Sequence, residues 1–155
     1  MERRTIQRAV AIVLVGGALG VVANALSPRG IPYIAPPKPV LQAQDVIPLA
    51  EAQSLWSTGA TFFLDARAPA DYAAGHIANA FSLPVEDFDQ RYPAVAAMLT
   101  PDSSIVVYCD GLQCDLSHRL MVKLRQLGYR HVHVLVNGWT VWQTARLPTH
   151  KGDQP

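Results

Sequence analysis

The stretch that decides the fold is SIVVYCDGLQCDLSHRLMVKLRQL, residues 104–127. It opens with an apolar run at residues 104–108, which predicts a buried β-strand. Cys109 follows the run directly, and a short polar loop leads from it to a series of leucines. The leucines at helical spacing are Leu116, Leu120, Leu124 and Leu127. This spacing predicts a helix over residues 116–127, which Gly128 ends.

A strand, a cysteine, a loop and a helix in this order are typical of a sulfur nucleophile that handles anionic groups. Backbone N–H groups of the loop and of the helix start would point inward and form a cradle for negative charge. Such a cradle lowers the pKa of a thiol, and the thiolate is the reactive form. The alternative is a buried cysteine that only ends the strand, but the position of Cys109 directly before a loop favours the nucleophile.

The N-terminus carries a membrane-targeting pattern. Arg3, Arg4 and Arg8 precede the 18-residue apolar run AVAIVLVGGALGVVANAL at residues 9–26. A helix of this length reaches the lower limit for crossing the hydrocarbon core of a bilayer. The basic flank is expected to stay in the cytoplasm, which places the following domain in the periplasm or outside the cell. The alternative is a cleaved signal peptide, because Ala-Asn-Ala at residues 23–25 has the form of a cleavage site.

Prolines dominate the segment after the apolar run. They are Pro28, Pro32, Pro36, Pro37 and Pro39, and such a composition predicts an extended linker. We therefore expect four segments along the chain. They are an anchor or signal at residues 1–27, the linker at 28–43, a globular domain at 44–150 and a tail at 151–155.

Strands and helices alternate through the globular domain, which predicts an α/β fold with a parallel sheet flanked by helices. Besides residues 104–108, strands are expected at 44–47, 61–64, 80–83 and 132–136. Besides residues 116–127, helices are expected at 48–57, 69–74 and 138–147, with one or two more over 85–99, interrupted at Pro93. Ligands bind at the carboxyl ends of parallel strands, which is where Asp65 and Cys109 are expected.

Charge and cysteine content exclude three further classes of protein. The net charge is +1 and the basic residues after Arg8 are scattered, so we expect no nucleic-acid binding. Two cysteines are too few for a disulfide framework or for the paired ligands of a zinc ribbon, so no metal site is expected.

Three stretches together resemble a rhodanese domain. They are LDARAPADYAAGHIANAFSLP at residues 64–84, VVYCDGLQCDLSHRL at 106–120 and VLVNGWTVW at 134–142. In that family a strand ends in Asp-x-Arg, Gly-His-Ile and Leu-Pro follow, and a later strand ends in the catalytic cysteine. The resemblance runs from about residue 45 to residue 147. Asn137 replaces a glycine common in the family, so its side chain is expected to reshape the pocket rim or to adopt a left-handed conformation.

The resemblance implies a sulfurtransferase with Cys109 as the catalytic residue. The thiolate would take sulfur from a small donor such as thiosulfate, hold it as a persulfide and pass it to a thiophilic acceptor. Backbone N–H groups of the active-site loop would stabilise both sulfur species. The loop consists of Asp110, Gly111, Leu112, Gln113, Cys114 and Asp115. The resemblance implies no organic cofactor and no metal.

The residues expected to support the loop are Asp65, Arg67, Ser117 and Arg119. Asp65 and Arg67 are expected to form an ion pair, and Ser117 takes the helix-start position of a family serine. The family loop often carries an arginine after the cysteine, and this loop does not. Arg119, Lys123 and Arg67 are the candidates for supplying the missing positive charge.

The loop aspartates change the expected chemistry. Asp110 and Asp115 oppose thiolate formation and repel dianionic donors, which makes thiosulfate a less favourable substrate. Asp115 also stands six positions after Cys109, where phosphatases of this fold carry an arginine. Because a carboxylate there repels phosphate, the phosphatase interpretation is rejected.

Cys114 leaves alternatives open. It is a resolving thiol that releases sulfur and closes a disulfide with Cys109, one half of a static disulfide that silences the nucleophile, or a small loop residue. A thiol–disulfide redox module that uses both cysteines is therefore an alternative function, and a non-catalytic binding module is another. Besides the sulfur donor and acceptor, a membrane or redox protein is a candidate partner.

Overall fold

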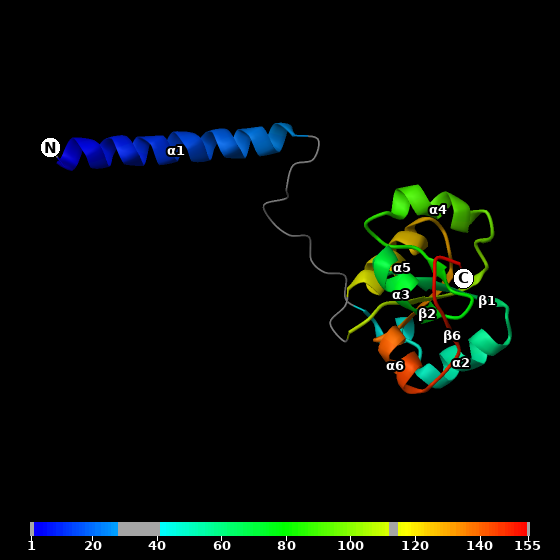
Figure 1. The fold of residues 1–155 in the computed structure, drawn as a ribbon. Helices are drawn as coiled ribbons and strands as arrows, with labels where there is room; N and C mark the ends of the chain where they lie inside the picture. Colours follow the sequence, from blue (N-terminus) through cyan, green and yellow to red (C-terminus); the bar gives the residue numbers. More distant parts are fainter. Residues whose placement is uncertain (1, 28–40, 112–114, 155) are drawn as a thin grey trace. The chain divides into compact units, whose positions relative to one another are not determined.

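The structure is a computed structural model that describes residues 2–27, 41–111 and 115–154 (Figure 1). It divides into two compact units, Met1–Lys38 and Pro39–Pro155, and each is described by itself. The predicted linker, residues 28–43, falls largely outside the described residues.

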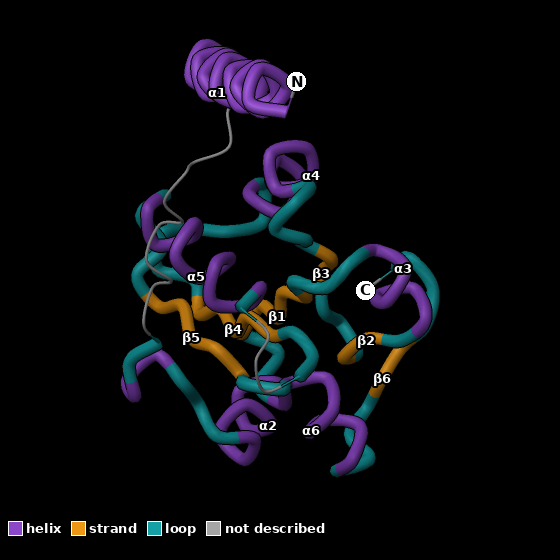
Figure 2. The backbone as a smooth tube through the Cα atoms, turned by 90° about the vertical axis from the view of Figure 1, so that its left-hand side faces the viewer, coloured by secondary structure: helices purple, strands orange, loops and turns teal. Residues whose placement is uncertain are grey.

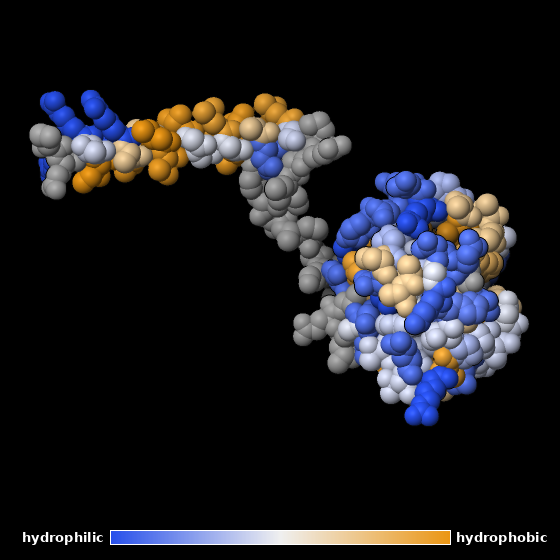
Figure 3. Space-filling model, viewed as in Figure 1, coloured by the Kyte–Doolittle hydropathy of each residue, from blue (hydrophilic) through white to orange (hydrophobic). Residues whose placement is uncertain are grey.

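The described part of the first unit is the helix α1 (Glu2–Leu26) and the residue after it. Within it, Arg3–Leu26 is long and apolar enough to cross a membrane, and its residues are almost all exposed (Figure 3). An apolar helix at the N-terminus was predicted from the sequence. Because a signal sequence has the same length and composition, the helix fits both the anchor and the signal peptide.

A sheet of four strands forms the centre of the second unit, in the order β3-β1-β4-β5 (Figure 2). The strands are β1 (Thr61–Asp65), β3 (Phe81–Ser82), β4 (Ser104–Tyr108) and β5 (His131–Leu135), and all neighbours are parallel. The predicted parallel α/β sheet is thus confirmed. Since Asp65 of β1 is in register with Tyr108 of β4, the two central strands end at the same edge.

Helices cover both faces of this sheet, as Figure 2 shows. Helices α4 (Phe88–Ala96) and α5 (Leu116–Gln126) lie on one face, and α2 (Leu49–Ser57) and α6 (Gly138–Thr144) lie on the other. Successive residues of a strand point to opposite faces. Val107 therefore packs in the core beneath α4 and α5, and its neighbour Val106 packs in the core beneath α2 and α6.

The strand predicted at residues 44–47 is wrong. Ala43–Asp45 form the 3₁₀ helix η1, and Val46 makes only an isolated bridge to Val134. The cause is the buried side chain of Asp45, whose Oδ2 accepts a hydrogen bond from Gln42 N at 3.0 Å. A side chain that bonds its own backbone in this way competes with strand pairing.

The interruption predicted at Pro93 is also wrong, because α4 continues through this proline. A proline inside a helix removes one backbone hydrogen bond. Phe88 and Val95, which stand on either side of Pro93 in the helix, are buried in the core. Their packing holds the helix together across the missing hydrogen bond.

A small second sheet was not foreseen from the sequence. β2 (His76–Ile77) pairs antiparallel with β6 (Thr149–His150), directly after α3 (Pro69–Ala74). Two-residue strands are too short to show a periodic pattern. The remaining predicted helices agree with the structure to within a few residues.

Candidate active site

Cys109 occupies the carboxyl end of β4, as predicted, and is only 1% exposed. Its sulfur lies 3.2 Å from the hydroxyl oxygen of Ser117, in the first turn of α5. Its carbonyl oxygen accepts a hydrogen bond from the N–H of Trp139, at the start of α6. In this structure the sulfur of Cys109 is disulfide-bonded, so the site is described in its oxidised form.

The active-site loop is described only at its two ends. Asp110 and Gly111 follow Cys109, and Asp115 caps the N-terminus of α5. The predicted loop residues Leu112, Gln113 and Cys114 lie outside the described residues. The same holds for the predicted pairing of Cys109 with Cys114 and for the central part of the N–H cradle.

The first residues of the loop are held by α6 and by the residue before it. Gly111 N donates to Asn137 Oδ1 at 2.8 Å and to Asp110 Oδ1 at 3.0 Å. Thr140 Oγ1 donates to the same Asp110 oxygen. Asn137 has a φ of 51°, which is the left-handed conformation expected for it from the sequence. The role of Thr140 was missed, because its contact joins residues far apart in the chain.

The predicted ion pair between Asp65 and Arg67 is confirmed at the end of β1. Arg67 Nη2 lies 2.6 Å from Asp65 Oδ2, and Arg67 Nε lies 3.0 Å from Asp65 Oδ1. The Asp65 side chain is 0% exposed and that of Arg67 is 7% exposed. Burial lowers the pKa of Arg67, but the hydrogen bonds and the charge of Asp65 outweigh it, so the pKa is raised. The guanidinium is therefore a fixed positive charge with a fixed counterion.

Trp139 forms a wall beside this ion pair. Its ring centroid lies 4.6 Å from the guanidinium carbon of Arg67, a cation–π contact. Gly75 permits this arrangement, because a Cβ at that position would stand 3.0 Å from the tryptophan ring. The sequence showed that a tryptophan was present but not that it would contact Arg67.

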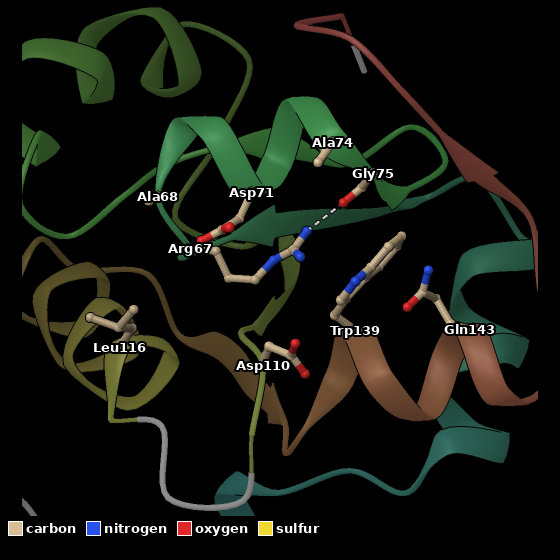
Figure 4. Close-up of a pocket in the computed structure, with 9 residues that line it drawn as sticks. All are labelled: Arg67, Ala68, Asp71, Ala74, Gly75, Asp110, Leu116, Trp139 and Gln143. Atoms are coloured by element: carbon tan, nitrogen blue, oxygen red, sulfur yellow. Dashed lines mark hydrogen bonds between the residues drawn. The ribbon is translucent and has the colours of Figure 1, made fainter.

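A cavity of about 550 Å³ opens between these groups (Figure 4). Its lining comes from the ends of β1 and β4 and from α3, α5 and α6. The lining residues are Arg67, Ala68, Asp71, Ala74, Gly75, Asp110, Leu116, Trp139 and Gln143. Among the described residues, no group of three His, Cys, Asp or Glu side chains is placed to hold a metal ion. The cavity is thus suited to a small organic or inorganic molecule beside the loop that follows Cys109.

The other basic candidates for the missing loop charge face elsewhere. Arg119 pairs with Glu86 at 3.0 Å, and both side chains are largely exposed. The ammonium of Lys123 lies 4.6 Å from the ring centroid of Phe88. Neither residue lines the cavity. Arg67 does line it, but its charge is already paired with Asp65.

Comparison with known proteins decides the family. The sequence profile of the Rhodanese-like domain matches residues 49–145, which is more than half of the chain. This chain belongs to the rhodanese-like family. Its predicted catalytic cysteine and Asp-x-Arg motif thus lie inside the part of the rhodanese-like domain that the profile covers.

Relatives of this rhodanese-like domain have names that describe different functions. An HTH-type transcriptional regulator of Mycobacterium tuberculosis is 33% identical over 70% of this chain and 46% of its own length. A tRNA uridine(34) hydroxylase of Photorhabdus laumondii is 33% identical over 50% of this chain and 22% of its own. The chain therefore spans less than half of these relatives.

A solved structure with the same fold is that of a thiosulfate sulfurtransferase from Pseudomonas aeruginosa. It matches with a TM-score of 0.56 and 24% identity over 68% of this chain and 20% of that protein. At this identity the likeness shows the shared fold and nothing about the reaction.

Proposed function

We propose that this rhodanese-like domain is a sulfurtransferase that carries sulfur as a persulfide on Cys109. The supporting observation is the position of the cysteine: it ends β4, contacts Ser117 and adjoins the loop that borders the cavity. The active form is the reduced one, in which Cys109 is a thiolate. The names of the relatives span more than one chemistry, so the proposal rests on the cysteine and on the family resemblance.

The reaction proceeds in two displacement steps. In the first, the Cys109 thiolate attacks the outer sulfur of a donor R–S–S⁻ or of thiosulfate. The donor's S–S bond breaks, R–S⁻ or sulfite leaves with the electron pair, and Cys109 becomes a persulfide. In the second, an acceptor thiolate attacks the outer sulfur of the protonated persulfide, which yields the acceptor persulfide and restores the Cys109 thiolate.

Two features of the fold stabilise the negative charge on sulfur. The Ser117 hydroxyl, 3.2 Å from the cysteine sulfur, is placed to donate a hydrogen bond to the thiolate. The N-terminus of the 11-residue helix α5 lies next to it and contributes the positive end of the helix dipole. The exposed Asp110 opposes this effect, which disfavours a dianionic donor such as thiosulfate.

Sulfur transfer is tested with the reduced full-length protein in detergent micelles. A donor, thiosulfate or polysulfide, and an acceptor thiol are added, and the acceptor persulfide is quantified with time. We expect turnover by the wild type and by Cys114→Ser, and none by Cys109→Ser. Equal turnover by Cys109→Ser and by the wild type would show that another group transfers the sulfur.

A thiol–disulfide redox function is the second candidate, because the sulfur of Cys109 is disulfide-bonded in the structure. In this function a substrate dithiol is oxidised while the Cys109 disulfide is reduced. Oxidation of a model dithiol by the protein, with no sulfur transfer from any donor, would favour it. Sulfur transfer that persists in Cys114→Ser would exclude it as the main activity.

We also propose that α1 anchors the domain in the cytoplasmic membrane, with the domain in the periplasm or outside the cell. The support is the length and apolar surface of α1 together with its basic N-terminal end. Membrane fractionation and protease digestion of intact cells test this topology. Recovery of a shortened soluble form would indicate a cleaved signal peptide instead.

A further inference from the structure

The charge of the cavity beside Cys109 is dominated by carboxylates. Asp71 of α3 and Asp110 of the active-site loop both line it and are both exposed (Figure 4). They reach the cavity from opposite sides in this view, and Gln143 adds an exposed neutral amide. Any molecule that approaches the loop through this cavity therefore passes between two negative charges.

The cation that lines the cavity is already neutralised. Two nitrogens of Arg67, Nε and Nη2, bind the carboxylate of Asp65, and Nη2 also donates to the carbonyl oxygen of Gly75 at 2.7 Å. Trp139 covers the guanidinium from the side. To bind an anionic substrate, Arg67 would have to break buried hydrogen bonds with Asp65, which is unfavourable.

Asp110 is held in position at the cavity wall. Its Oδ1 accepts hydrogen bonds from Gly111 N and Thr140 Oγ1. Both donors are neutral, so they fix the position of the carboxylate without removing its charge.

We infer that the molecule that exchanges sulfur with Cys109 carries a positive charge close to its reacting sulfur, as an amine-bearing thiol or persulfide does. This inference rests on the proposed sulfurtransferase function and specifies its substrate class. A cation near Asp71 and Asp110 is attracted by both carboxylates, whereas a carboxylate or sulfonate at the same place is repelled by both. At distances of a few ångströms near a protein surface, each carboxylate changes the ratio of the cation's rate to the anion's rate several-fold. The two carboxylates together therefore give about a tenfold preference for the cation.

Thiol-reactive probes of different charge measure this preference without any sulfur transfer. The full-length Cys114→Ser protein is reduced in detergent, so that Cys109 is its sole thiol. It is then mixed with alkyl methanethiosulfonates that bear an ammonium, a neutral or a sulfonate group. The thiolate attacks the reagent's thio sulfur, methanesulfinate leaves with the electron pair, and a mixed disulfide forms. Each rate is divided by that of 2-mercaptoethanol with the same reagent.

We expect the ammonium reagent to react about tenfold faster than the sulfonate reagent after this correction. Asp71→Asn, added to Cys114→Ser, should reduce the preference several-fold. The matched control is Asp102→Asn, because Asp102 is an exposed aspartate in the turn that precedes β4, at the opposite end of that strand. This control should leave the preference unchanged.

Equal rates for the two reagents, or a faster sulfonate reagent, would overturn the inference. An equal effect of Asp71→Asn and Asp102→Asn would overturn it as well, because the preference would then come from net charge. The proposed function is judged separately by loading Cys114→Ser with polysulfide and measuring its mass. A persulfide without charge preference refutes only the inference, whereas the absence of any persulfide refutes the function and, with it, the assignment of a sulfur-carrying substrate.

Discussion

The carboxyl ends of β1 and β4 have the same strand geometry but differ in their charged side chains. Both strands have five residues, pair in register and end at one edge of the sheet. At the end of β1, Asp65 and Arg67 are buried and bound to each other. After β4, Asp110 is exposed, and the hydrogen-bond donors that hold it are neutral.

This difference distinguishes charges that hold the fold together from charges that act on a ligand. A buried carboxylate with a fixed counterion holds the chain in place, but its electrostatic effect on a ligand is small because the counterion neutralises it. An exposed carboxylate held by neutral hydrogen-bond donors acts electrostatically on whatever enters the cavity. The cavity thus has a neutralised ion pair at the end of β1 and an exposed negative charge directly after Cys109 at the end of β4.

The largest effect is expected from Asp65→Asn, which leaves the buried Arg67 without its counterion. We expect the free energy of unfolding to fall by about 3–5 kcal/mol, measured by urea denaturation with tryptophan fluorescence. The control is Asp102→Asn, which removes a charge from an exposed ion pair with Arg130 and should cost less than about 1 kcal/mol. Similar losses in the two variants would contradict a structural role that is specific to the β1 end.

A smaller loss is expected from Tyr108→Phe, at the residue of β4 that is in register with Asp65. The hydroxyl of Tyr108 accepts a hydrogen bond from the N–H of Ile77 at 3.1 Å, and both residues are buried. Its removal leaves that N–H unpaired and should cost about 2 kcal/mol of unfolding free energy. Tyr129→Phe is the control, since the hydroxyls of Tyr129 and Tyr92 bond each other in a partly buried site. If Tyr108→Phe lost no more unfolding free energy than the control, water would have to replace the hydroxyl as the partner of the Ile77 N–H.

A second ion pair, in which Asp45 is buried and Arg125 is partly exposed, tests whether paired charges stabilise this fold elsewhere. Arg125 lies 2.7 Å from Asp45, and this hydrogen bond lowers the pKa of Asp45 although burial opposes the shift. A lowered carboxyl pKa stabilises the fold above the ordinary value of 3.8, and the contribution disappears as the pH falls through the lowered value.

We therefore expect Asp45→Asn to cost about 1.5 kcal/mol at pH 7 and progressively less as the pH falls below 3.8. Urea denaturation of the wild type and the variant over this pH range provides the measurement. A difference that stays constant down to the lowest pH at which both proteins fold would show that the charge of Asp45 contributes nothing.

The smallest effect is expected from Thr140→Val, which removes one of the donors to Asp110. The site is exposed, so unfolding should change by about 0.5 kcal/mol and the rate of sulfur transfer by about twofold. Thr144→Val is the matched control on the same helix, because its hydroxyl bonds a backbone carbonyl instead. A loss of sulfur transfer greater than about tenfold would mean that Thr140 does more than position the loop.

The sequence predicted those parts of the site that depend on short stretches of chain. Cys109 follows an apolar run and precedes a helix pattern, so its place at the end of β4 could be read directly. Asp65 and Arg67 are two residues apart, which made their ion pair foreseeable from the Asp-x-Arg motif. These features need only local periodicity and a short motif.

The parts that could not be predicted depend on contacts between distant segments. Gly111 bonds Asn137, and Thr140 bonds Asp110, across gaps of 26 and 30 residues. Asp45 forms an ion pair with Arg125, 80 residues away, and lies in a 3₁₀ helix where a strand was expected. In each case a side-chain contact made by the tertiary fold overrode the local preference.

The most direct test of the account is the mass of the reduced full-length protein after incubation with polysulfide, followed by alkylation and peptide mapping. The account predicts a gain of one sulfur atom, located on Cys109, retained in Cys114→Ser and absent from Cys109→Ser. Sulfur located only on Cys114 would contradict it. So would a protein that gains no sulfur from any donor and instead closes a disulfide between its two cysteines.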